Sequence, residues 1–101
     1  MTDPQPVVIF RREAEAELTQ AFEWYEARSG GLGGQFLIAV DAALSRIVRD
    51  PEAYPVVHRD VRRSLMRRFP FVLYYVAESG RVTILACFHG RRDPGRWQRR
   101  R

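Results

Sequence analysis

The sequence predicts an α+β fold in which a helix hairpin packs on a mostly antiparallel four-stranded sheet, followed by a short C-terminal helix. Three observations lead to this prediction. A short β-branched stretch opens the chain, two longer stretches carry apolar residues at helical spacing, and three stretches after residue 55 alternate with period two. The predicted element order is β-α-α-β-β-β. A length of 101 residues predicts that residues 1–101 form a single domain.

The first half of the chain predicts one strand and then two helices. Residues 6–10 are rich in β-branched and apolar side chains and predict the strand. The first helix begins at Arg11, and its apolar face comprises Ala14, Leu18, Ala21, Phe22 and Tyr25. Ser29-Gly30-Gly31 ends this helix, since glycine is common just past a helix C-terminus. The second helix runs from about Gly33 to Arg49 and is stopped by Asp50-Pro51; its apolar face comprises Phe36, Val40, Ala43, Leu44 and Ile47.

The second half predicts three strands and the terminal helix. The strands are Val61–Arg68, Phe71–Ala77 and Arg81–His89, and Glu78-Ser79-Gly80 forms a tight hairpin between the last two. Strict alternation along the last strand places Val82, Ile84, Ala86 and Phe88 on one face and Thr83, Leu85, Cys87 and His89 on the other. Asp93 and Pro94 resemble an N-cap followed by proline at the first helical position, which predicts a helix near residues 95–100.

Charge is distributed unevenly along the chain, and every basic residue is an arginine. Residues 1–52 hold five arginines and nine acidic residues, a net charge of −4, whereas residues 53–101 hold twelve arginines and three acidic residues, a net charge of +9. Guanidinium groups bind phosphates and carboxylates with two parallel hydrogen bonds. The second half therefore predicts an anionic partner, and the isoelectric point near 10.3 favours nucleic acid.

Several functional classes are excluded by composition. One cysteine, Cys87, permits no disulfide within the chain. No apolar run reaches the roughly 18–20 residues that span a membrane, and the polar N-terminus carries no signal-peptide pattern. We therefore expect a cytoplasmic protein that has no membrane segment, metal or cofactor.

The glycine-rich segment and the two histidines are candidate motifs of low specificity. The segment 29–34 superficially suggests a phosphate loop, but it lacks a lysine and follows a helix, which favours a helix-hairpin turn. The spacing of His58 and His89 matches no zinc pattern, and His58 is expected in a loop. His89 lies next to Arg91 and Arg92, whose charge disfavours its protonated form. It is therefore a candidate neutral base, and the alternative is a strand-end residue bonded to the backbone.

The arginines form a candidate binding surface. Alternation along the strand 61–68 places Arg62 and Arg68 on one face and Arg63 and Arg67 on the other. Together with the closing segment they predict a dense basic patch, although edge arginines also act merely to prevent aggregation. Candidate surface residues are Arg63, Arg67, Arg68, Arg92, Trp97, Arg99 and Arg100. Trp97 is expected to anchor the terminal helix on the sheet, and base stacking is its alternative role.

The order of these motifs resembles the RelE/ParE superfamily of type II toxin–antitoxin toxins. The residues that carry the resemblance are Ala14, Leu18, Trp24-Tyr25-Glu26, Gly31-Leu32-Gly33, Phe36, Asp50-Pro51, Tyr54-Pro55, Val61-Arg62, Phe69-Pro70-Phe71, Tyr74, His89, Arg92-Asp93-Pro94, Trp97 and Arg100. They span nearly the whole chain. The resemblance implies a growth-inhibiting toxin that a co-expressed antitoxin holds inactive in a hetero-oligomer.

The resemblance also implies positions for a ribonuclease site on the ribosome. Arg62 fits one of the second-strand basic positions, and Arg91 fits the closing arginine. The neighbouring basic position falls near Ser64 or Arg63. In this interpretation Arg62 and Arg91 stabilise charge on the mRNA phosphate, and His89 substitutes as the base.

Two positions depart from the ribonuclease pattern. The third-strand arginine falls at Phe71, and the closing tyrosine falls at Trp97, which has no ionisable proton. The departures favour the ParE branch, which is similar in fold and poisons DNA gyrase. A ribosome-dependent mRNA interferase and a non-toxic basic nucleic-acid-binding module remain the alternatives.

Overall fold

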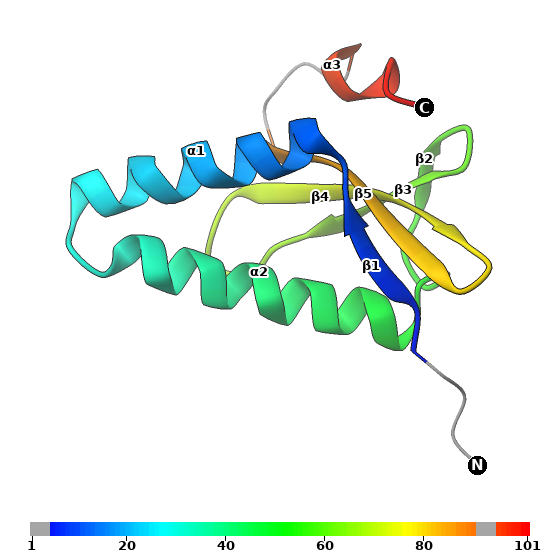
Figure 1. Ribbon diagram of the computed structural model, residues 1–101, viewed down its shortest axis with the longest axis horizontal. Coiled ribbons are helices and arrows are strands. Elements are labelled where there is room, and N and C mark those ends of the chain that lie inside the picture. Colours follow the sequence, from blue (N-terminus) through cyan, green and yellow to red (C-terminus); the bar gives the residue numbers. More distant parts are fainter. Residues whose placement is uncertain (1–4, 91–94) are drawn as a thin grey trace.

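The structure is a computed structural model that describes residues 5–90 and 95–101 (Figure 1). Its elements, in chain order, are β1 (Val7–Phe10), α1 (Arg12–Arg28), α2 (Leu32–Arg49), β2 (Val56–His58), β3 (Val61–Leu65), β4 (Phe71–Glu78), β5 (Arg81–His89) and α3 (Gly95–Gln98). The predicted α+β class is confirmed. Among the described residues, no helix has the length and hydrophobicity needed to cross a membrane.

The sheet has five strands, so the prediction of four was wrong. Their spatial order is β1-β5-β4-β3-β2, and β1 runs parallel to β5 while the other neighbours are antiparallel. The additional strand, β2, has only three residues, and Val56 and Val57 are exposed on it. Such a strand is too short to show a period-two pattern. His58 consequently lies in a strand and not in the expected loop.

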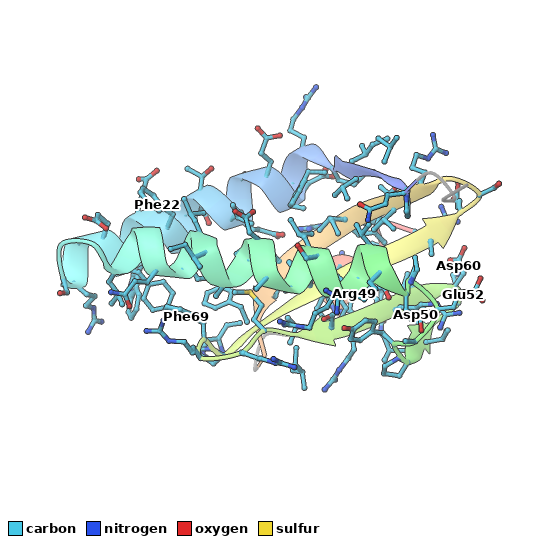
Figure 2. All side chains as sticks on the ribbon, turned by 90° about the horizontal axis from the view of Figure 1, so that it is seen from below. Phe22, Arg49, Asp50, Glu52, Asp60 and Phe69 are labelled. Carbon is cyan, nitrogen blue, oxygen red and sulfur yellow. The ribbon has the colours of Figure 1, made fainter. Side chains whose placement is uncertain are left out.

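The helix hairpin covers one face of the sheet, as Figures 1 and 2 show. The predicted apolar faces are confirmed, because all their residues either belong to the main core cluster or pack against it. Phe36 and Ile47 of α2 are fully buried, and Phe69 joins them from the loop between β3 and β4. Figure 2 places Phe22 and Phe69 at one end of the molecule, opposite the acidic residues Asp50, Glu52 and Asp60.

The hairpin turn is held by a carboxylate. Glu26 accepts hydrogen bonds from the N–H groups of Gly31 and Gly33, both at 2.9 Å. It therefore satisfies donors that the start of α2 leaves without helical partners. Gly33 is also a packing requirement, since a Cβ there would lie 2.8 Å from the Phe22 ring.

A β-bulge in β5 contradicts the predicted alternation on that strand. Tyr74 pairs with Ala86 but Tyr75 pairs with Ile84, so β5 carries an extra residue at Leu85. The side chains therefore change face within the strand. Val82, Ile84 and Cys87 belong to the core beneath the helices, whereas Leu85, Ala86 and Phe88 belong to a second cluster on the other face.

The second cluster is covered by the C-terminal segment. Trp97 is 2% exposed, and its ring stacks on Tyr74 with centroids 4.1 Å apart. His58 lies edge-on to the same indole at 5.8 Å. The expectation that Trp97 anchors the terminal helix is confirmed.

Two elements were predicted to be longer than they are. Strand β3 ends at Leu65, and Arg68 adopts a left-handed φ of +73°, so Arg67 and Arg68 do not continue its alternation. Helix α3 ends at Gln98, and the turns after it are closed by the N–H groups of Arg100 and Arg101, which donate to the carbonyls of Trp97 and Gln98. The predicted cap at Asp93 and Pro94 lies outside the described residues.

Candidate functional site

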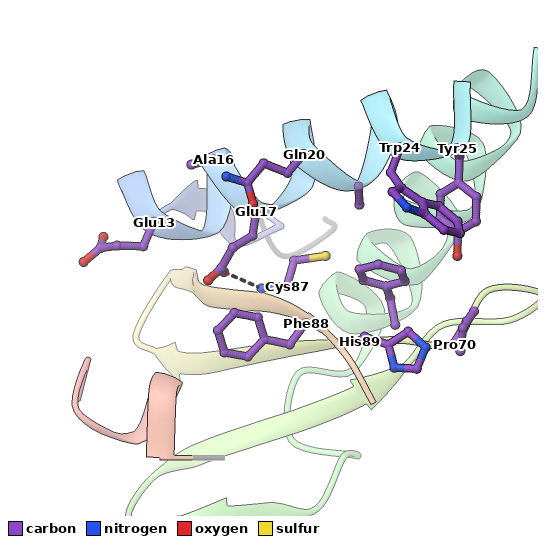
Figure 3. Close-up of a pocket in the computed structure, with 12 residues that line it drawn as sticks. Glu13, Ala16, Glu17, Gln20, Trp24, Tyr25, Pro70, Cys87, Phe88 and His89 are labelled. Carbon is purple, nitrogen blue, oxygen red and sulfur yellow. Dashed lines mark hydrogen bonds between the residues drawn. The ribbon is translucent and has the colours of Figure 1, made fainter. Parts of the chain in front are cut away.

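A groove of about 850 Å³ lies between α1 and the C-terminal half of β5 (Figure 3). Its lining combines apolar and polar side chains: Glu13, Ala16, Glu17, Gln20, Ala21, Trp24, Tyr25, Pro70, Phe71, Cys87, Phe88 and His89. The β-bulge contributes to this arrangement, since it places Cys87 on the helix side of the sheet. A concave site of this size with an apolar lining is typical of ligand or peptide binding.

The two ends of the groove differ in character. Glu13 and Glu17 lie at one end, and Trp24, Tyr25 and His89 lie at the other (Figure 3). Trp24 is 52% exposed and the Arg28 guanidinium stacks over its ring at 4.1 Å. An exposed indole with a stacked cation is a common anchor in protein interfaces.

The groove contains no activated cysteine. Burial raises the pKa of the Cys87 thiol to about 12, and the nearby Glu17 carboxylate acts in the same direction. Because thiolate is the reactive form, Cys87 is not a nucleophile near neutral pH. Burial also raises the pKa of Tyr25 above its usual value.

His89 lies at the groove as a strand-end residue. It is partly exposed, and its ring lies 5.7 Å from the Phe71 ring, which is its register partner on β4. The structure therefore places the predicted base beside an aromatic side chain where the ribonuclease pattern has an arginine.

An ion pair joins α1 to the C-terminal segment beside the groove. Arg100 donates to both carboxylate oxygens of Glu17, at 2.7 and 3.0 Å, and also to the Leu85 carbonyl at 2.9 Å. Glu17 in turn accepts the Cys87 N–H at 3.1 Å. Arg100 was predicted from the sequence to belong to the binding surface, but the structure places its guanidinium in a hydrogen-bond network within the fold.

Arg62 is also bonded within the fold. It faces the helix side of the sheet, opposite Tyr75, and donates to the carbonyls of Glu52 and Tyr54 at 3.0 and 2.7 Å. Tyr75 donates its hydroxyl to the Pro51 carbonyl at 2.6 Å. The two side chains fix the loop between α2 and β2.

The other predicted arginines are more exposed. Arg63 lies opposite Tyr74 and projects from the sheet face that carries Trp97, since cross-strand partners share a face. Arg67 and Arg99 are exposed, and Arg68 donates to Gln35 at 2.8 Å. Arg91 and Arg92 lie outside the described residues.

Some features of the site had no signal in the sequence. Glu17 and Arg100 are 83 positions apart, and only the fold brings them together. The glycine-rich segment forms the hairpin turn and directs its N–H groups at Glu26 instead of at a phosphate. In residues 5–90 and 95–101, no group of three or more metal-binding side chains occurs.

Comparisons with known proteins agree with this architecture. The structure is similar to a solved chain described as "Chromosomal ParDE TA system from P. aeruginosa", with a TM-score of 0.63 and 19% sequence identity. The similarity covers 84% of this chain and 96% of that one. A search among curated proteins gives no match. The family model described as "ParE toxin of type II toxin-antitoxin system, parDE" matches residues 8–94. The chain belongs to the family of ParE toxins, the toxin components of type II toxin–antitoxin systems.

Proposed function

We propose that this toxin poisons DNA gyrase and that an antitoxin inactivates it by binding in the groove between α1 and β5. The family match over residues 8–94 is to ParE toxins, the branch whose resemblance implies a gyrase target and not an mRNA target. It also favours a toxin over a non-toxic nucleic-acid-binding module. The observation that carries the choice of target is the packing of two positions assigned to the ribonuclease site.

Arg62 is the first of these positions. Its guanidinium donates to two loop carbonyls, those of Glu52 and Tyr54. Both bonds come from Nη1, so the position of the guanidinium is fixed by the loop and only Nε and Nη2 remain for a phosphate. We therefore assign Arg62 to positioning the loop at residues 50–55.

Trp97 is the second. It replaces the closing tyrosine and is buried in a stack with Tyr74. An indole N–H only donates hydrogen bonds and does not transfer a proton near neutral pH. The catalytic assignment of Arg62, His89 and Arg91 is therefore the less favoured prediction.

The exposed arginines of the second half are the proposed contact surface for the gyrase–DNA complex. Arg63, Arg67 and Arg99 are exposed, in contrast to Arg100. Exposed arginines remain available for phosphate contacts, which dominate affinity for DNA. We propose that Arg68 and Arg92 extend this surface and that Trp97 and Arg100 support it from within the fold.

Purified gyrase tests the target surface. An Arg63→Ala/Arg67→Ala variant is expected to inhibit supercoiling at least about tenfold more weakly than the parent, because two phosphate contacts are lost. Arg49→Ala is the matched control, since Arg49 is an exposed arginine on α2. Equal inhibition by the double variant and the parent would place the contact surface elsewhere.

The groove is tested separately as the binding site of the antitoxin. Trp24→Ala removes the exposed aromatic anchor without disturbing the core, and we expect it to weaken co-purification with the antitoxin encoded beside the toxin gene. Ile38→Ala on α2 is the control, because Ile38 is 70% exposed and lies outside the groove lining. Unchanged binding by Trp24→Ala would argue against the groove as the antitoxin site.

A further inference from the structure

Strand β1 covers only the first part of one edge of β5. Their register runs from Val7 opposite Arg81 to Phe10 opposite Ile84, and the Arg11 N–H then donates to the Ile84 carbonyl at 2.9 Å. Beyond this point the chain turns into α1, while β5 continues to His89. Residues 85–89 therefore extend past the end of the neighbouring strand.

Two side chains bond to the backbone of this extension. Arg100 donates to the Leu85 carbonyl at 2.9 Å, and Glu17 accepts the Cys87 N–H at 3.1 Å. The two side chains also bind each other through a double hydrogen bond, and each is 16% exposed. Figure 3 shows the contact between Glu17 and the Cys87 backbone. One carbonyl and one N–H of β5 are thus satisfied by α1 and the C-terminal segment, not by a strand.

This arrangement matters because an open strand edge is a template for another chain. Free N–H and C=O groups along an edge promote sheet-to-sheet association, and charged side chains placed there oppose it. Hydrogen bonds from ionised groups are shorter and stronger than those between neutral groups. A carboxylate and a guanidinium are consequently well suited to occupy one donor and one acceptor of the same edge.

We propose that Glu17 and Arg100 form a side-chain cap on β5 that closes this part of the edge to strand addition by a second copy of the chain. The same cap fixes the C-terminal segment on the sheet. The proposal does not depend on the gyrase target, since it concerns the free toxin.

Hydrogen exchange of the Cys87 amide tests the cap directly. Glu17→Ala is expected to accelerate exchange at least about tenfold, because the N–H loses its acceptor. Glu17→Gln keeps a side-chain carbonyl and loses only the charge, so it should retain part of the protection. If Glu17→Gln and Glu17→Ala accelerate the exchange equally, Glu17 acts only through its ion pair with Arg100 and the proposal fails.

Arg100 variants test the second half of the cap. Arg100→Ala should accelerate Cys87 exchange, since Arg100 orients Glu17, and Arg100→Lys should give an intermediate rate. Arg101→Ala is the matched control, because Arg101 pairs with Asp60 and Glu78 and does not contact β5 through these bonds. Unchanged exchange in Arg100→Ala would overturn the proposal.

A charge-reversed pair distinguishes hydrogen bonding to the β5 backbone from charge attraction between residues 17 and 100. Glu17→Arg combined with Arg100→Glu restores opposite charges, but residue 17 then has no acceptor for the Cys87 N–H and residue 100 has no donor for the Leu85 carbonyl. We expect the Cys87 amide of this double variant to exchange as fast as in Glu17→Ala, which also lacks the acceptor. Recovery of the parent rate would overturn the cap.

Association of the variants tests the closure of the edge. Arg100→Ala should form dimers or larger species in sedimentation experiments at concentrations where the parent and Arg101→Ala sediment as monomers. An Arg100→Ala protein that folds and sediments as the parent does would refute the closing role.

Discussion

At the scale of single residues, the helix hairpin depends on glycine at position 33. A Cβ there would lie 2.8 Å from two Phe22 ring carbons and 2.9 Å from Glu26 Oε1. We expect Gly33→Ala to lower the free energy of unfolding by about 1–3 kcal/mol, the usual cost of overpacking, measured by urea denaturation.

Gly34 provides the matched control, because the space around a Cβ at that position is open. It lies in the same turn of α2, where alanine has the higher helix propensity. Gly34→Ala should therefore leave stability unchanged or raise it by about 0.5–1 kcal/mol. Equal destabilisation by both substitutions would show that backbone freedom, and not packing, explains Gly33.

The buried thiol of Cys87 predicts a loss of stability in alkali. Burial raises its pKa to about 12 from a reference of 9.0, so above pH 9 the unfolded chain loses this proton while the folded chain keeps it. Unfolding then becomes easier as the pH rises. Tyr75, whose pKa is raised by burial to about 12 from 10.0, acts with the same sign.

Urea midpoints measured between pH 8 and pH 11 check this dependence. We expect the midpoint to fall over this range, and to fall less steeply in Cys87→Ala, which has no thiol to ionise. A steeper fall in Cys87→Ala than in the parent would contradict the account.

At the scale of elements, the C-terminal segment is part of the core. Trp97 is 2% exposed on the Tyr74 ring, whereas Trp24 is 52% exposed on α1. Trp97→Ala should lower the free energy of unfolding by about 3–5 kcal/mol, the usual cost of deleting a buried aromatic side chain. Trp24→Ala should cost less than about 1 kcal/mol. Denaturation followed by circular dichroism compares them, and similar losses in both would contradict the assigned burial.

The elements also show what the sequence could predict. Helices α1 and α2 were predictable because their apolar residues repeat at helical spacing over about three turns each. The β-bulge was not predictable, since Leu85 and Ala86 are both apolar and fit either face of a strand that is buried on both sides. Strand β2 is defined by its pairing with β3, and no local sequence pattern predicts that pairing.

The candidate site was less predictable than the fold. The charge of Arg62 and Arg100 was visible in the sequence, but their partners come from residues 52–54 and from Glu17. The groove is likewise formed by α1 and β5, which are distant in sequence. Residue type predicted the chemistry available, and tertiary contacts decide which arginines are free to use it.

At the scale of the whole molecule, the uneven charge follows the architecture. The acidic first half holds the helix hairpin, and the basic second half holds β3, β4, β5 and the C-terminal segment. The Glu17–Arg100 ion pair is one of the contacts that join the two halves. The exposed arginines therefore lie on the part of the molecule to which we assign the gyrase–DNA contact.

The most direct test of the gyrase assignment compares both targets with one preparation of the folded toxin. In one arm the toxin is incubated with purified gyrase and plasmid, and denatured products are examined for cleaved DNA. In the other arm it is added to translating ribosomes, and the mRNA is examined for new ends. We expect cleaved DNA and intact mRNA. Normal supercoiling together with cut mRNA would contradict the gyrase assignment.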